Sequence, residues 1–459
     1  MKTYQSSEIR NVAVVGHAHC GKTTLVAALL HAAKMTPAQG RVADGTAATA
    51  YDEEEVARGV TMQNAVAFAE WQGAKINLVD TPGFHMFTHE VRSAMLPVES
   101  ALVVVNAQTG IEPVTERVWR FAEEASIPRI VLVNQMDHPK AGGTGGLSAM
   151  LDDIAERWGR TCVPVQLPIS DASGFHGIVD LVTMQAWNYT PNSGGQGKST
   201  AEIPASIAAD AKARHEALIE LVAEGKDELM EEYFDSGTLA PEHLTAALHD
   251  AIREDRIFPV LFGAGLSNMG LDHLLDFIKA YAPSPAERAP FEGLKPAAPG
   301  AEPTPVERKV ADSEPAAALV FKTMSDPFAG RITFFKVLSG IIKNDATLEN
   351  YTRRGQERFA HIAAMQGRKP IEVPEFHAGD IGAVGKLRET LTGDVLGAKG
   401  GDILVPLPPL PEPAMTYAIE PKSRADEDKL APAIHKLMEE DLLIRFFRDP
   451  QTNDFLIAG

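Results

Sequence analysis

The stretch Gly16-His17-Ala18-His19-Cys20-Gly21-Lys22-Thr23 decides the fold, because it fits the pattern G-x-x-x-x-G-K-[ST]. An apolar run from Val12 to Val15 precedes it, and an Ala/Leu-rich stretch from Thr24 to Ala33 follows it. Strand, glycine-rich loop and helix in this order predict a phosphate-binding loop. A chance loop that happens to contain Gly and Lys is the alternative, and the flanking strand and helix argue against it.

The residue types in this loop suit the binding of phosphate. Glycines allow the backbone to curl until several N–H groups point at one anion. The helix that begins near Lys22 adds the positive end of its dipole. We expect Lys22 to reach the β- and γ-phosphate oxygens and the Thr23 hydroxyl to bind Mg²⁺.

Length and composition predict a multidomain protein of the cytoplasm. The 459 residues suggest about three domains of ~150 residues each. The apolar share is 44%, no apolar run approaches the ~18 residues of a membrane span, and the polar N-terminus has no secretory segment. Cys20 and Cys162 are too few for a disulfide framework, which favours a reducing compartment.

The formal net charge of −19 argues against a protein that coats nucleic acid in general. It leaves room for a local basic face that docks on a nucleoprotein particle, and Arg353, Arg354, Arg445 and Arg448 are candidates for such a face. For each arginine alone, a solvated charge on a mixed surface is the alternative.

Two segments after the loop have the composition of nucleotide-sensing elements. Residues 36–59 predict a mobile loop that ends in Arg58-Gly59-Val60-Thr61, and Thr61 is placed to contact Mg²⁺ when a γ-phosphate is present. A buried strand at 76–79 leads into Asp80-Thr81-Pro82-Gly83. We expect Asp80 to hold Mg²⁺ through water and the Gly83 N–H to approach the γ-phosphate. Each segment alone is also compatible with an ordinary turn.

Further apolar runs at 101–105 and 130–133, with a helix at 113–125 between them, predict a parallel sheet with helices on both faces. The second run ends in Asn134-Gln135-Met136-Asp137. A buried Asp137 can accept the ring N–H and the exocyclic amine of guanine, a pair of donors that adenine lacks. After a further strand at 258–262, Gly263-Ala264-Gly265 is expected to pass beneath the base. In isolation, the tetrapeptide Asn134 to Asp137 is also compatible with an ordinary connection from a strand to a loop.

The remaining pattern predicts the domain borders. The first domain is expected at 1–285, with an α+β insertion at about 158–256, followed by a Pro/Ala/Glu-rich linker at 286–312. Period-two apolar runs with Gly turns predict a small β-barrel at 313–405. After a proline-rich stretch at 406–413, residues 412–459 predict a strand, a helix and a strand. Because such a unit is not self-sufficient, we expect the sequence to be the front part of a longer protein.

The ordered motifs resemble those of translational GTPases. They are Gly16 to Thr24, Arg58 to Thr61, Asp80 to Gly83 and Asn134 to Asp137. The segments 320–330 and 334–337 resemble the barrel of elongation factor G, and 420–422 and 439–441 resemble the third domain of that factor. The resemblance implies an α/β P-loop GTPase domain with a mostly parallel sheet, helices on both faces and an α+β insertion, then a β-barrel and a partial α+β domain. It implies that the last two domains of the family are missing from this sequence.

The resemblance also implies a ribosome-bound factor with GTP or GDP and Mg²⁺ as ligands. We further expect a cytoplasmic monomer without membrane attachment or sequence-specific DNA binding. The expected catalytic residues are Lys22, Thr61, Gly83 and His85, and the expected metal-binding residues are Thr23, Thr61 and Asp80. The expected nucleotide-binding residues are Gly16, His17, Ala18, His19, Cys20, Gly21, Lys22, Thr23, Thr24, Asn134, Gln135, Asp137, Ala264 and Gly265.

The sequence departs from the family pattern in four motifs. His19 replaces an Asp implicated in holding a monovalent ion, and Gln135 replaces the lysine that packs along the base. Ala264-Gly265 replaces Ser-Ala. Phe84 replaces the histidine that positions the attacking water, and phenylalanine cannot hydrogen-bond water. An aromatic ring at this place also occurs in some elongation factor G-like paralogues, so the chain resembles that group more than the housekeeping factor.

These departures leave three functional hypotheses. The first is a GTPase that acts on the ribosome, with Lys22, Mg²⁺ and backbone donors carrying the chemistry. The second is a GTP-dependent ribosome-binding switch that hydrolyses slowly because of Phe84. His85 or His89 could substitute as the water-orienting group, although surface histidines on such a helix usually have no such role. The third is a P-loop ATPase unrelated to translation, which Asp137 disfavours.

Overall fold

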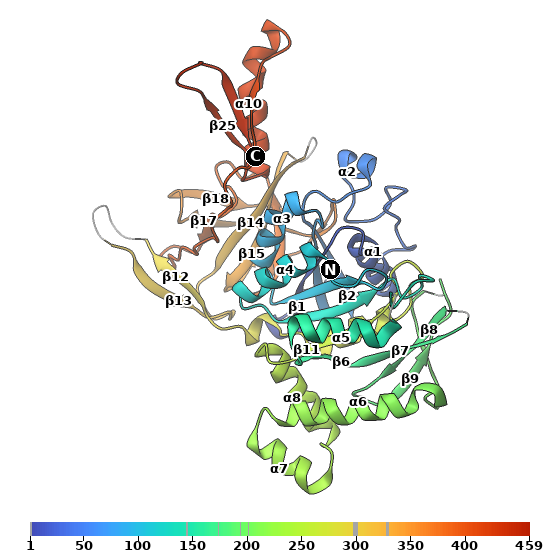
Figure 1. The fold of residues 1–459 in the computed structure, drawn as a ribbon. Coiled ribbons are helices and arrows are strands. Elements are labelled where there is room, and N and C mark those ends of the chain that lie inside the picture. Colours follow the sequence, from blue (N-terminus) through green and yellow to red (C-terminus); the bar gives the residue numbers. More distant parts are fainter. Residues whose placement is uncertain are drawn as a thin grey trace. The chain divides into compact units, whose positions relative to one another are not determined.

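The computed structural model describes residues 2–143, 146–172, 174–192, 194–200, 202–296, 302–326 and 330–459, with only the backbone at 424, 425 and 427 (Figure 1). The chain divides into two compact units, which we describe separately. The N-terminal unit comprises residues 7–288 and 365–370, and the C-terminal unit comprises 289–364, 371–459 and the residues up to Ser6. Within the described ranges, the helices are all too short or too polar to cross a membrane.

A seven-stranded sheet organises the N-terminal unit, in the order β2-β3-β1-β4-β5-β11-β6. Edge strand β2 runs antiparallel to β3, and the other neighbouring pairs are parallel. Parallel strands buried on both faces read as continuous apolar runs, and Val12 to Val15 are fully buried. The strands are β1 (Ile9–Gly16), β2 (Ala65–Trp71), β3 (Ala74–Asp80), β4 (Ser100–Asn106), β5 (Arg129–Asn134), β6 (Cys162–Pro164) and β11 (Phe258–Phe262).

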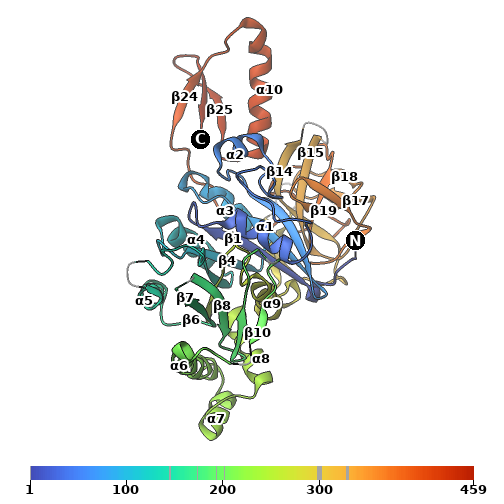
Figure 2. The same ribbon diagram turned by 90° about the vertical axis from the view of Figure 1, so that its right-hand side faces the viewer.

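Helices cover both faces of this sheet, as the sequence predicts. Helices α1 and α9 pack together on one face, while α3, α4 and α5 lie on the other (Figures 1 and 2). Helix α1 starts directly after Gly21, whose φ of 87° is easily adopted only by glycine. The helices are α1 (Lys22–Ala32), α2 (Glu53–Arg58), α3 (Thr88–Met95), α4 (Pro113–Glu124), α5 (Gly146–Trp158) and α9 (Leu271–Tyr281), with 3₁₀ turns η1 (Ser6–Glu8), η2 (His85–Phe87) and η3 (Pro285–Glu287).

The insertion between β6 and β11 is a small α+β layer. Its antiparallel sheet has the order β10-β9-β8-β7, and its three helices include α6, which packs on α7 and α8. The elements are β7 (Gln166–Asp171), β8 (Gly174–Asp180), β9 (Gln185–Asn188), β10 (Lys198–Thr200), α6 (Ala205–Ala223), α7 (Asp227–Ser236) and α8 (Pro241–Arg253). Its apolar side chains join one continuous core with those of α1 and the main sheet.

The C-terminal unit is rich in antiparallel strands. An eight-stranded sheet has the order β18-β17-β23-β14-β15-β22-β19-β20, and two two-stranded pairs join β12 to β13 and β16 to β21. A three-stranded sheet, β24-β26-β25, accompanies helix α10. The elements are β12 (Phe291–Lys295), β13 (Thr304–Arg308), β14 (Ala317–Asp326), β15 (Gly330–Ser339), β16 (Ile342–Lys343), β17 (Ala346–Asn350), β18 (Gly355–Phe359), β19 (Ala363–Gln366), β20 (Lys369–Glu372), β21 (Glu375–Phe376), β22 (Ile381–Gly385), β23 (Val395–Gly397), β24 (Thr416–Ile419), α10 (Arg424–Glu440), β25 (Arg445–Arg448) and β26 (Phe455–Ala458).

The arginines considered for a basic face have partners within this unit. Arg353 Nε donates to the buried Asp394 carboxylate at 2.7 Å, and Arg445 pairs with Glu412 at 2.8 Å. Arg448 Nε donates to the Asn453 carbonyl at 2.8 Å. The charges of Arg353 and Arg445 are therefore partly neutralised, which weakens the expectation of a strongly basic local face.

The predicted fold class is confirmed: a P-loop α/β domain with a mostly parallel sheet and an α+β insertion precedes β-rich elements. Several elements were not predicted. They are helix α2 within the segment 36–59, the paired strands β12 and β13 within the segment 286–312, and α5, α7 and β25. Parts of the predicted linker (297–301), insertion (173, 193 and 201) and barrel motif (327–329) lie outside the described residues. The predicted domain borders stay predictions.

Candidate functional site

Glycines shape the loop between β1 and α1 through close approaches of the backbone. At Gly16, with φ of 150°, a Cβ atom would collide with the Val104 carbonyl oxygen. At Gly21 it would lie 2.8 Å from Asn134 Nδ2. That amide is fixed, because Asn134 Nδ2 donates to the Cys20 carbonyl at 2.8 Å and Asn134 Oδ1 accepts from the Gly265 N–H at 3.0 Å. Asn134 thus bridges the loop to the segment after β11.

The loop forms one wall of a cavity of about 250 Å³, which we call the phosphate cavity. Lys22 is buried beside it, and Nζ donates to the carbonyl oxygens of Gly16 at 3.0 Å and His17 at 2.8 Å. The Lys22 ammonium is therefore held under the loop. An anion bound by the N–H groups of the loop would lie next to this ammonium. The lining residues are Ala18, His19, Gly21, Lys22, Thr23, Thr24, Val42, Gly59, Val60, Thr61, Gly83, Phe84 and Gln135.

Hydroxyl and carboxylate oxygens gather beside this cavity. The hydroxyls of Thr23 and Thr61 hydrogen-bond to each other at 3.0 Å, although 38 residues separate them. Glu55 of α2 fixes the chain after Thr61, because Oε1 accepts from the N–H groups of Met62 at 2.7 Å and Gln63 at 3.0 Å. These contacts hold the Thr61 hydroxyl next to the start of α1.

Asp80 is fully buried at the end of β3. Its Oδ2 accepts from Thr49 Oγ1 at 2.7 Å, while Oδ1 has no hydrogen-bond partner among the described residues. Burial raises the pKa of the Asp80 carboxyl to about 6, which the Thr49 hydrogen bond opposes. The structure thus leaves one buried carboxylate oxygen near two hydroxyls for a further ligand. No cluster of three His, Cys, Asp or Glu side chains suited to a metal occurs within the described ranges.

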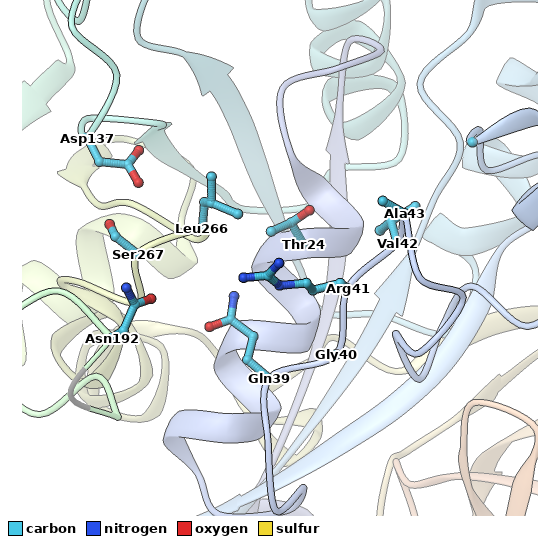
Figure 3. A pocket seen from close by; sticks show the side chains of 11 residues that line it. Thr24, Gln39, Gly40, Arg41, Val42, Ala43, Asp137, Asn192, Leu266 and Ser267 are labelled. Carbon is cyan, nitrogen blue, oxygen red and sulfur yellow. The ribbon is translucent and has the colours of Figure 1, made fainter.

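A second, larger cavity of about 820 Å³ adjoins the first and shares Thr24, Val42 and Gly59 with it; we call it the base cavity. Asp137 lines it together with Leu266 and Ser267. Figure 3 shows Asp137, Ser267 and Asn192 on one side of the space and Gln39 and Arg41 on the other. The volume lies within the range of ~300–1,000 Å³ usual for small-molecule sites.

Ala264 and Gly265, which the sequence predicts beneath the base, do not line the base cavity. Ala264 is fully buried, and Gly265 is used in backbone hydrogen bonds to Asn134 and Gln39; neither is among the lining residues. Ala264 and Met269 exchange two backbone hydrogen bonds, so the chain turns back between them. Leu266 and Ser267 therefore face the cavity from this turn, two positions further along than the sequence suggests.

The histidine candidates occupy three different surroundings. His19 lines the phosphate cavity, and its ring stands edge to face with Phe84, with centroids 5.5 Å apart. His85 is exposed and does not line that cavity. His89 is buried on α3, with Nε2 3.8 Å from Glu90. Of the three rings, the structure places only that of His19 at the phosphate cavity.

Two other loop residues, His17 and Cys20, are not among those that line the phosphate cavity. His17 accepts a hydrogen bond at Nδ1 from the Val114 N–H at 3.3 Å and lies 3.6 Å from Glu112. Cys20 is buried with Sγ 3.7 Å from Lys22 Nζ, and burial raises the pKa of its thiol. Gln135 Nε2 instead donates to the His19 carbonyl at 2.9 Å, so this side chain steadies the loop.

Sequence reasoning missed several residues that the fold brings to the site. Thr49 carries no local motif, and only its contact with Asp80 reveals it. Gln39, Arg41 and Val42 come from a loop whose sequence predicts mobility, and Asn192 comes from the insertion. No signal in the sequence alone identifies these residues, because Thr49 reaches Asp80, and the others reach the base cavity, through long-range packing.

Comparisons with known proteins agree with this geometry. A family model described as the elongation factor Tu GTP binding domain matches residues 7–284. Models of elongation factor G domain 2 and elongation factor G domain III match residues 315–399 and 410–459. A crystal structure of a protein from Thermus thermophilus is similar over 99% of this chain, with 31% sequence identity and a TM-score of 0.87. The present chain spans 64% of the length of that protein.

The first model covers more than half of the chain and includes both cavities. The order of the three matched models along the chain is that of elongation factor G. Membership of such a family implies the binding of a guanine nucleotide. The chain belongs to the translational GTPases of the elongation factor G type.

Proposed function

We propose that the chain binds GTP and GDP with Mg²⁺ and hydrolyses GTP in a ribosome-linked cycle. The observation that supports this most directly is the pairing of two cavities: one is lined by Lys22, Thr23, Thr61 and Gly83, and the adjoining one is lined by Asp137. The two parts of a guanine nucleotide, a charged polyphosphate and a base with hydrogen-bonding groups, match these two adjoining cavities. An anionic tail suits the first cavity, and a base with two N–H donors suits the second.

The residues present fit a magnesium ion. Mg²⁺ prefers oxygen ligands and is usually held by one or two carboxylates together with phosphate oxygens and water. Oδ1 of buried Asp80 has no hydrogen-bond partner within the described part of the chain, and with the adjoining hydroxyls of Thr23 and Thr61 it forms such a donor set. These three residues would hold the ion, directly or through water. When bound, Mg²⁺ neutralises charge on the β- and γ-phosphate oxygens.

The chain's own residues would do the rest of the work. Lys22 leaves the loop carbonyls to contact the β- and γ-phosphates, and the N–H groups of residues 18–23 surround the β-phosphate. The Gly83 N–H donates to the γ-phosphate, and its lack of a side chain allows the close approach seen to Ala18. Asp137 accepts from guanine, with Leu266 and Ser267 around the base. His85 is a weak candidate for the catalytic group that the sequence predicts, because its side chain is exposed and does not line the phosphate cavity.

A slow GTP-dependent switch is the second candidate, and Phe84 favours it. This side chain lines the phosphate cavity at the position where the family pattern has a water-orienting histidine. A phenyl ring cannot hydrogen-bond an attacking water, so the intrinsic rate is expected to be low. The two candidate functions involve the same bound nucleotide and differ in the rate of GTP hydrolysis.

The ribosome is proposed as the partner because domain 2 and domain III models of elongation factor G match the C-terminal unit. We also propose a cytoplasmic monomer, in keeping with the few cysteines of the sequence.

Multiple-turnover GTP hydrolysis, measured with and without ribosomes, tests the proposal. The enzyme hypothesis expects ribosomes to raise the rate well above the intrinsic one. The switch hypothesis expects GTP-dependent co-sedimentation with ribosomes and little hydrolysis. If GTP promotes neither hydrolysis nor co-sedimentation, the ribosome-linked function is wrong.

A further inference from the structure

The junction of the two cavities carries a positively charged side chain that has no assigned role. Thr24, Val42 and Gly59 line both cavities, so they mark the junction. A nucleotide with its base beside Asp137 and its terminal phosphates above Lys22 would place its ribose and first phosphate there. Arg41 directly precedes Val42 and lines the base cavity.

The loop that carries Arg41 is anchored at three points. Its own turn is closed, because Arg41 N–H donates to Thr46 Oγ1 at 2.9 Å and Thr46 N–H donates to the Arg41 carbonyl at 3.0 Å. On the α1 side, Val42 packs against a small apolar cluster of Ala27, Ala47 and Ala50. These contacts hold the Arg41 backbone at the wall of the cavity.

A third anchor ties the loop to the base side. Gln39 Nε2 donates to the Gly265 carbonyl at 2.7 Å, and Gln39 Oε1 accepts from Asn268 Nδ2 at 3.3 Å. Gln39 therefore joins the Arg41 loop to the turn that presents Leu266 and Ser267. These contacts fix the position of the Arg41 loop relative to Leu266 and Ser267.

The Arg41 guanidinium is directed into the base cavity (Figure 3). Figure 3 shows the side chain extending from the loop into the space bordered by Thr24 and Gln39. Among the residues that the structure describes, none forms a hydrogen bond or ion pair with this guanidinium, although the protein carries a formal net charge of −19. An unpaired cation directed into a cavity of an acidic protein suits an anionic ligand.

We propose that Arg41 is a nucleotide-binding residue whose guanidinium pairs with the phosphate nearest the ribose. The inference rests on the proposed binding of a guanine nucleotide and adds a residue to it. A guanidinium presents planar, paired N–H donors that match two phosphate oxygens, and such charge-assisted bonds are about twice as strong as neutral ones. Lys22 then serves the outer phosphates and Arg41 the inner one.

The test compares Arg41→Gln with Arg41→Lys and with a charge-matched control, Arg160→Gln. Arg160 follows α5 in the same unit, its side chain is 83% exposed, and it lines neither cavity. Dissociation constants for GMP, GDP and GTP are measured by competition with a fluorescent GDP analogue at low and high salt. Equal melting temperatures of the variants confirm that the fold is kept.

Arg41→Gln is expected to weaken GMP, GDP and GTP by the same factor, about fivefold to tenfold at low salt. The loss is expected to shrink at high salt because salt screens the contact. Arg41→Lys is expected to recover part of the affinity, and Arg160→Gln is expected to match the unsubstituted protein. Unchanged affinity in Arg41→Gln overturns the inference. A loss confined to GDP and GTP, or a loss that salt does not alter, also overturns it.

Failure of this inference is distinguishable from failure of the proposed function. If the unsubstituted protein binds GDP and GTP but Arg41→Gln binds them equally well, only the role of Arg41 is wrong. If the unsubstituted protein binds neither nucleotide, the proposed function itself is wrong.

Discussion

The imidazole of His19 and the phenyl ring of Phe84 stand edge to face, with an interplanar angle of 89° and centroids 5.5 Å apart. This is a favourable geometry for an aromatic pair. Two positions that depart from the family pattern thus contact each other across the phosphate cavity. The pair joins the glycine loop to the segment after β3, and a substitution at one position is expected to alter the other.

Replacing Phe84 by histidine tests whether this ring limits hydrolysis. Under the switch hypothesis, Phe84→His supplies a group that hydrogen-bonds the attacking water, and the ribosome-stimulated rate of GTP hydrolysis rises about tenfold or more. Phe84→Leu is the control, because it removes the ring without adding a hydrogen-bonding group. A rate for Phe84→His equal to that of Phe84→Leu contradicts the idea that position 84 controls the chemistry.

Adding one methyl group at Gly83 tests the close approach of the two loops. A Cβ atom there would collide with Lys22 Nζ and lie 2.6 Å from the Ala18 nitrogen. Gly83→Ala is therefore expected to displace the loop and weaken GTP binding about tenfold or more, while the melting temperature changes little. Gly355→Ala is the control, because its Cβ would meet nothing within 4 Å. Unchanged GTP affinity in Gly83→Ala argues against a role for Gly83 in the site.

Thr49 is predicted to orient the Asp80 carboxylate for magnesium. Thr49→Val keeps the shape of the side chain but removes the hydrogen bond to Asp80 Oδ2. The Mg²⁺ concentration needed for half-maximal GDP binding is expected to rise about tenfold or more, as for other residues that support metal ligands. GDP binding measured in EDTA is expected to be unchanged. Thr49→Ser keeps the hydroxyl and should resemble the unsubstituted protein; if all three proteins need the same Mg²⁺ concentration, Thr49 has no such role.

Asp137 is predicted to choose the base. Asp137→Asn exchanges an oxygen acceptor for an amide donor, so the preference is expected to shift from GTP towards xanthosine triphosphate, which presents an oxygen where guanine has its amine. Affinities for both nucleotides, measured in parallel, check this. Loss of GTP binding without any gain for xanthosine triphosphate counts against a direct contact with the base.

Much of the N-terminal unit could be predicted from local pattern. Strand β11 has the predicted bounds, 258–262, and helix α4 ends one residue before the predicted helix at 113–125, because their apolar residues give a clear local signal. Helix α2 was missed although its caps are visible in the sequence: Asp52 accepts from the N–H groups of Glu54 and Glu55, and Gly59 ends the helix with φ of 65°. Its apolar content is too small to give a periodic signal.

The site was predictable where the chemistry follows a linear motif and unpredictable where it follows packing. Most of residues 18–24, together with Thr61, Gly83 and Asp137, line the two cavities as expected, although their roles stay predictions. The contacts of Thr49 with Asp80 and of His19 with Phe84 join segments 31 and 65 residues apart. Strands β12 and β13 were likewise missed, because a ribbon in a Pro- and Glu-rich stretch depends on pairing that no single segment reveals.

A nucleotide titration of the unsubstituted protein tests the central claim most directly. In the presence of Mg²⁺, GDP and GTP are expected to compete with a fluorescent GDP analogue at concentrations where ATP does not. Removal of Mg²⁺ is expected to weaken both. If ATP competes as well as GTP, or if millimolar GDP and GTP leave the site empty, the two cavities do not form a guanine-nucleotide site.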